Sequence, residues 1–138
     1  MAATTSSRLR RPLSGGWLLA AAQCAFALWF AASVYLALKR ASQFAGYFYV
    51  PSAGDALTAE IDVAGGWGWA LPVTWTLTMG PLLAGLSFVA SVVLLVTRHA
   101  RGNRGLLIVM IGGAAAAALT VAVGVTPDVL SIAGWLSD

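Results

Sequence analysis

Ionisable side chains are scarce in this sequence, whose 138 residues include only eight lysines and arginines and five acidic residues. Charged residues make up 9% of the chain, whereas an ordinary soluble domain has roughly 25%. Hydrophobic residues make up 59%, so the composition indicates an integral membrane protein. The cations lie in short clusters beside apolar segments, where membrane topology and anionic lipid headgroups explain them. We therefore expect no nucleic-acid partner, despite an isoelectric point near 9.6.

Metal ligands and catalytic groups are also few. Cys24 is the only cysteine and His99 the only histidine, which excludes an internal disulfide and leaves too few ligands for haem or zinc. We expect Cys24 to be a buried, unreactive thiol. The predicted spans hold no Asp, Glu, Lys, Arg or His, although proton relays and coupled transporters normally need such groups. We expect no cofactor and no catalytic activity.

Long apolar segments are what the sequence has in abundance. Val63–Thr97 contains no charged residue, yet as one helix it would be about 50 Å long against a hydrocarbon core of ~30 Å. Pro72 suits the first turn of a helix, so we predict a span at residues 72–97. Two further apolar runs predict spans at residues 14–38 and 105–125. The predicted fold class is an all-α integral membrane protein with three transmembrane helices and a short C-terminal interfacial helix.

The segments outside the spans are short. Residues 1–13 are polar and basic, and we predict that they are disordered in the cytoplasm. Residues 39–71 form the predicted extracytoplasmic loop with an aromatic collar, and residues 98–104 form a cytoplasmic turn that makes its two flanking spans antiparallel neighbours. Residues 126–138 are too few to cross the membrane. We expect them to form a helix along its surface, with Trp135 as the anchor.

Lysine and arginine determine the predicted orientation. Six arginines fall on one side of the membrane and are the topology-determining candidates: Arg8, Arg10, Arg11, Arg98, Arg101 and Arg104. Only Lys39 and Arg40 fall on the other side, together with all five acids. The positive-inside rule then places the N-terminus in the cytoplasm and the C-terminus outside. The excess of Ala, Gly, Val and Arg over Ile and Lys is typical of GC-rich bacterial genomes, so the expected location is a bacterial inner membrane.

Small and polar residues inside the spans are the candidates for helix packing: Gln23, Ala21, Ala25, Ala32, Gly112, Gly113, Ala116 and Ala117. The Gln23 carboxamide needs a partner in hydrocarbon, which is either on a neighbouring helix or on the backbone of its own helix, unless the residue is exposed near the membrane interface. Small residues four apart let two helix backbones approach closely. We expect the alanines of the first span, or Gly113 with Ala117, to contact partner helices.

Pro81 lies inside the second span, where it predicts a kink. Such a kink can serve as a hinge, although it more often shapes helix packing alone.

Six aromatic residues near the predicted outer surface are candidates for an interaction: Phe44, Tyr47, Phe48, Tyr49, Trp67 and Trp69. The alternative is the aromatic belt that membrane proteins place at headgroup level.

Three functional hypotheses remain open from the sequence. The first is an accessory or assembly subunit of a larger bacterial membrane complex, whose partners are the lipid bilayer and other membrane subunits. The second is a homo-oligomeric pore, or a carrier for a small apolar or lipid ligand, with Pro81 as the hinge. The third is a sensor that uses the aromatic residues of the outer loop.

Overall fold

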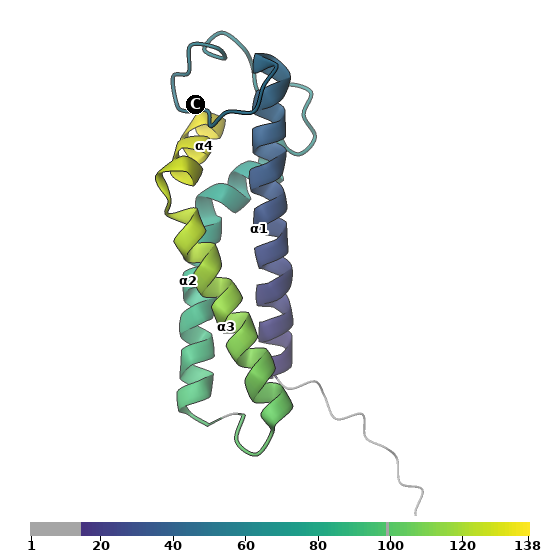
Figure 1. The fold of residues 1–138 in the computed structure, drawn as a ribbon, viewed down its shortest axis with the longest axis vertical. Helices are drawn as coiled ribbons and strands as arrows, with labels where there is room; N and C mark the ends of the chain where they lie inside the picture. Colours follow the sequence, from purple (N-terminus) through teal and green to yellow (C-terminus); the bar gives the residue numbers. More distant parts are fainter. Residues whose placement is uncertain (1–14, 99) are drawn as a thin grey trace, which may run out of the picture.

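The structure is a computed structural model that describes residues 15–98 and 100–138. These residues form four helices and no strand: α1 (Gly15–Ala45), α2 (Ala70–Val96), α3 (Arg104–Gly124) and α4 (Pro127–Ser137). Helices α1, α2 and α3 are long and apolar enough to cross a membrane, and they run side by side along the molecule (Figure 1). The predicted fold class is therefore confirmed. The predicted N-terminal segment with Arg8, Arg10 and Arg11, and the residue His99, lie outside the described residues.

Two helices, α1 and α2, begin or end more than one residue away from the predicted bounds. Helix α1 continues past Leu38 to Ala45 and ends before Gly46, whose φ of 80° is a left-handed conformation that favours glycine. Its 31 residues measure about 46 Å, so its last turns extend beyond a hydrocarbon core of ~30 Å. Helix α2 begins at Ala70 and holds Pro72 in its first turn, where the missing N–H interrupts no hydrogen bond. The connection between the two helices is consequently residues 46–69.

Glycines let the three long helices meet around Phe30, which is buried on α1. A methyl group added at Gly80 of α2 would lie 3.0 Å from the Phe30 ring, and one added at Gly124 of α3 would lie 3.3 Å from it. At Gly113 of α3, an added methyl group would lie only 2.8 Å from the Cα atom of Ala20. The backbones of α1 and α3 therefore approach closely at this position, as small residues allow in lipid.

Pro81 lies inside α2, and Figure 1 shows the first turns of this helix inclined to the rest. Interior proline removes one helical hydrogen bond and commonly produces such a bend. The hydroxyls of Thr76 and Thr78 donate to backbone carbonyls one turn earlier, at 2.7 and 2.8 Å. The Pro81 ring packs against Gly124 at the end of α3. This contact gives Pro81 a packing role, and its use as a hinge stays a prediction.

Helix α4 lies at the same end of the molecule as the 46–69 connection (Figure 1). Its buried apolar residues join a core that includes the ends of α1 and α2: Phe30, Ala37, Val73, Leu77, Val129 and Ile132. The prediction that Trp135 anchors the chain in the membrane surface is wrong. Its side chain is only 3% exposed, and its indole N–H donates to the hydroxyl of Thr58 at 2.9 Å. The connection folds over α4 and supplies this acceptor, so the indole needs no lipid interface.

Candidate functional sites

A polar contact joins α1 to α2 at inner positions of both helices. The Nε2 atom of Gln23 donates to the backbone oxygen of Ser87 at 3.0 Å and to the hydroxyl of Ser91 at 2.8 Å. Gln23 is only 4% exposed, and its Oε1 atom has no hydrogen-bond partner among the described residues. A methyl group added at Gly113 would lie 2.6 Å from this oxygen. The carboxamide thus lies among all three long helices and bonds to a neighbouring helix, as one of the alternatives from the sequence predicts.

A second cross-helix bond lies nearer the other end. The indole N–H of Trp29 on α1 donates to the hydroxyl of Thr76 on α2 at 2.6 Å, and that hydroxyl donates to the Pro72 carbonyl. Trp29 also contacts the ring of Trp69, with 5.9 Å between ring centroids. Sequence reasoning missed Trp29, although a tryptophan inside a span always has an N–H group that needs an acceptor.

The small-residue candidates of α3 divide between two faces. Gly113 and Ala117 are buried, whereas Gly112 is exposed and Ala116 half-buried. The expectation that Gly113 and Ala117 contact a partner helix is wrong, because α1 already occupies their face. Spacing alone cannot distinguish the two pairs, since each has the same separation of four residues.

The candidates on α1 are placed differently. Ala21, Ala25 and Ala32 are exposed, so other helices of this chain do not cover them. Cys24 is exposed beside them, and the expectation that this thiol is buried is wrong. The inner face of α1 carries Ala20, Gln23 and Phe30 instead.

Arg40 holds the 46–69 connection against the end of α1. Its guanidinium donates to the backbone oxygens of Val63, at 3.1 Å, and Gly65, at 3.0 Å. It also lies 4.9 Å from the ring centroid of Phe44 and 5.9 Å from that of Trp67, within the range of cation–π contacts. Sequence reasoning treated Arg40 only as a charge on the minority side. An arginine one turn before a phenylalanine on the same helix face was the available signal.

The six outer aromatic candidates do not form one surface. Phe44 and Trp67 surround Arg40, and Trp69 contacts Trp29. Tyr47 pairs with Tyr49 at 5.6 Å, and Tyr47 and Phe48 are exposed. Burial first, and then the nearby Asp55 carboxylate, together raise the pKa of the Tyr49 phenol to about 12. The phenol therefore stays neutral throughout the physiological pH range.

Three hydrogen bonds attach the connection to α4 and to the C-terminal residue that follows it. Besides the bond from Trp135 to Thr58, the Ser131 hydroxyl donates to the Pro51 carbonyl at 2.8 Å, and the Asp138 carboxylate accepts from the Gly54 amide at 2.8 Å. Together with Arg40 they connect this end of the molecule into one unit.

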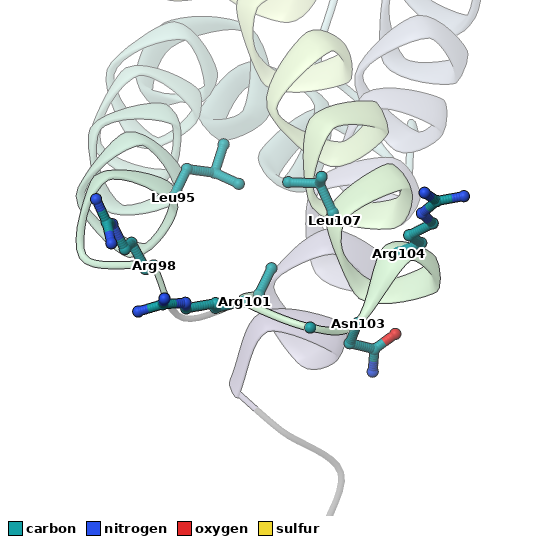
Figure 2. Close-up of a pocket in the computed structure, with 8 residues that line it drawn as sticks. Leu95, Arg98, Arg101, Asn103, Arg104 and Leu107 are labelled. Carbon is teal, nitrogen blue, oxygen red and sulfur yellow. The ribbon is translucent and has the colours of Figure 1, made fainter.

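The turn between α2 and α3, at the opposite end, encloses a basic pocket of about 520 Å³. Arg98, Arg101 and Arg104 line it, with Leu95 and Leu107 on its inner side (Figure 2). Asn103 caps α3 by accepting the Leu106 amide at 3.0 Å. These are the three topology-determining arginines that the structure describes, and it brings them together.

No group of three or more His, Cys, Asp or Glu side chains that could hold a metal ion occurs within residues 15–98 and 100–138. Asp55 and Asp62 instead accept hydrogen bonds from the nearby Leu57 and Gly65 amides. Comparison with protein-family models, with curated proteins and with solved structures finds no match to this chain.

Proposed function

We propose that this chain is a non-catalytic membrane protein that acts by binding another membrane subunit through the outward face of α1. The observation that carries the proposal is the combination of three alanines with three large side chains on that face. The residues are exposed and follow one another at spacings of three and four: Leu18, Ala21, Ala25, Leu28, Ala32 and Tyr35. We call this row the α1 stripe.

The α1 stripe has the form of a helix-packing surface. Spacings of three and four residues keep a row facing a neighbouring helix that crosses at a small angle. Ala21, Ala25 and Ala32 leave hollows in which a partner's side chains fit, and Leu28 projects between them with 74% of its surface exposed. In lipid, where the hydrophobic effect gives no drive for association, such close packing supplies the attraction between helices.

The outward row of α2 has a different character. It contains only medium and large side chains: Leu71, Trp75, Thr78, Leu82, Leu86, Val89, Val93 and Val96. A continuous row of mostly apolar side chains without small residues offers no hollow for a close helix contact, so α2 is the lipid-facing helix in this proposal. The contrast between two helices of the same chain supports a docking role for α1 in particular.

The proposed location is a bacterial inner membrane, with the basic turn in the cytoplasm. Arg98, Arg101 and Arg104 gather at one end of the bundle, which the positive-inside rule assigns to the cytoplasmic side. The spans predicted from the sequence, residues 14–38, 72–97 and 105–125, carry no Asp, Glu, Lys, Arg or His, which supports a role in assembly over one in catalysis.

Site-specific photo-cross-linking in cells tests the proposal. A photoreactive residue replaces Ala25 in the α1 stripe or, as the matched control, Ala90, an exposed alanine on α2 at a similar depth because its neighbour Ser91 bonds to Gln23. We expect a protein adduct of defined mass from position 25 and lipid adducts alone from position 90. An adduct of two copies of this 14.2 kDa chain would favour a homo-oligomer. Equal products from both positions would contradict a dedicated docking face.

The variants Ala25→Trp and Ala90→Trp extend the test. The first fills a hollow of the α1 stripe and should abolish recovery of the cross-linked partner at a fixed ratio, whereas the second should leave recovery unchanged. Circular dichroism of both purified variants should show unchanged helix content, since both positions are exposed.

A further inference from the structure

The basic pocket at the α2–α3 turn is built by backbone turns that the structure describes on both sides of residue 99. Successive turn bonds run from the amides of Arg98, Arg101 and Asn103 to carbonyls three residues earlier, at 3.0 to 3.1 Å. Arg98 adopts a φ of 60° and Gly102 a φ of 80°, both left-handed conformations that reverse the chain within a few residues. The buried Ala100, packed in a cluster with Leu106 and Met110, fixes the middle of the turn. The arginine side chains consequently project from a fixed frame.

The charge at this end has one sign. Within the described part of the chain, all five acidic residues belong to the 46–69 connection, to α4 or to the C-terminal residue. Arg98 and Arg101 lie at one side of the pocket and Arg104 at the other, and all three are exposed (Figure 2). Guanidinium groups present several N–H donors in a planar fork that matches the oxygens of a phosphate. The pocket therefore suits an anion with several oxygens.

The position of the pocket along the membrane normal indicates which class of anion it binds. Helix α3 begins at Arg104, and its 21 residues measure about 31 Å, close to the ~30 Å hydrocarbon thickness. The arginines then lie at the level of lipid phosphates, while Leu95 and Leu107 lie one turn deeper, at the start of the acyl chains. Figure 2 shows these two leucines on facing helices, pointing toward each other above Arg101.

We propose that this pocket binds an anionic phospholipid, whose phosphate lies beside Arg101 with the exposed Arg98 and Arg104 on either side, and whose glycerol and upper acyl chain lie against Leu95 and Leu107. The apolar inner side distinguishes a lipid from free phosphate, which would gain nothing from the two leucines. Basic pockets between membrane helices bind anionic headgroups in the same way. The proposal is independent of the partner subunit proposed for α1.

Native mass spectrometry of the full chain in detergent tests it, with phosphatidylglycerol and phosphatidylcholine added in equal amounts. We expect preferential retention of one phosphatidylglycerol. The double variant Arg101→Gln/Arg104→Gln should weaken retention by about fivefold for each arginine removed. Lys39→Gln, which removes a cation from the opposite end, should change it by less than about twofold. An equal loss in Lys39→Gln, or equal retention of both lipids by the unchanged chain, would overturn the proposal.

One further variant and one competition experiment complete the test. Arg101→Lys/Arg104→Lys preserves the charges that determine insertion, and it should still weaken retention because lysine lacks the planar fork. Unchanged retention in this variant would contradict the pocket geometry proposed here. Inorganic phosphate should not displace the lipid beyond the effect of sodium chloride at the same ionic strength. Displacement by phosphate alone would assign the pocket to a free anion and overturn the lipid.

Discussion

Gln23 shows how a single polar residue can determine helix register inside a membrane. Its Nε2 atom reaches the Ser87 carbonyl and the Ser91 hydroxyl, which lie one turn apart on α2. Cross-helix bonds of this kind contribute about 0.6–2 kcal/mol, and the unpartnered Oε1 atom offsets part of that gain. The net stabilisation is therefore small. Sliding α1 by one residue would nevertheless leave the whole carboxamide unpaired in hydrocarbon, so the contact selects one register.

Adjacent glycines on α3 offer a matched test of the close approach between α1 and α3. Gly113→Ala should destabilise the protein by about 1–3 kcal/mol, because the new methyl group would lie 2.8 Å from the Ala20 Cα atom and cannot be accommodated without separating the helices. Gly112→Ala should be neutral or slightly stabilising, because nothing lies within 4 Å of its added methyl group and alanine favours a helix. Reversible unfolding in mixed micelles measures both. Equal effects of the two substitutions would mean that the helices do not meet at Gly113.

Among the elements, the 46–69 connection depends most on a single side chain. Arg40 bonds to the carbonyls of Val63 and Gly65 and contacts the Phe44 and Trp67 rings. The connection contains no helix or strand, so this side chain and the three bonds to α4 hold it in place.

Replacing Arg40 with glutamine should loosen one part of the connection only. Loss of bonds worth about 1 kcal/mol at this partly exposed site should speed amide exchange of Gly65 and Trp67 by roughly threefold to tenfold. Hydrogen–deuterium exchange in nanodiscs measures these rates. Lys39→Gln is the control, since Lys39 is exposed and should leave both rates unchanged. A uniform increase across α1 and α2 would show instead that Arg40 stabilises the whole bundle.

The elements differ in how far the sequence predicts them. Hydropathy locates the three long helices, because each apolar run must satisfy its backbone within a helix when it crosses lipid. It misses the extension of α1 to Ala45, since Lys39 and Arg40 end the apolar run without ending the helix. It also misses the burial of Trp135, which depends on Thr58, a residue 77 positions away in the chain. Contacts between distant segments leave no periodic signal in a single sequence.

On the scale of the whole molecule, the two ends carry unequal charge. Three arginines and no acid line the basic pocket, whereas the other end carries Lys39 and Arg40 with all the acids of the described residues. Arg40 bonds to neutral carbonyls and keeps its charge, so Lys39 and Arg40 are the two cations that oppose the proposed orientation. The sequence predicts this asymmetry. The gathering of Arg98, Arg101 and Arg104 around one cavity emerges only from the fold of the turn.

The proposed orientation predicts which end of the bundle reacts with an impermeant thiol reagent. In a Cys24→Ala background, a thiol introduced by Ser52→Cys should react in intact cells, because Ser52 is exposed in the 46–69 connection. A thiol introduced by Asn103→Cys in the basic turn should react only after permeabilisation. Asn103→Cys removes a helix cap worth about 1 kcal/mol but keeps all three arginines, so topology should be preserved. Cys24→Ala alone controls for background labelling. Labelling of position 103 in intact cells, with position 52 protected, would invert the bundle and place the proposed lipid pocket in the outer leaflet.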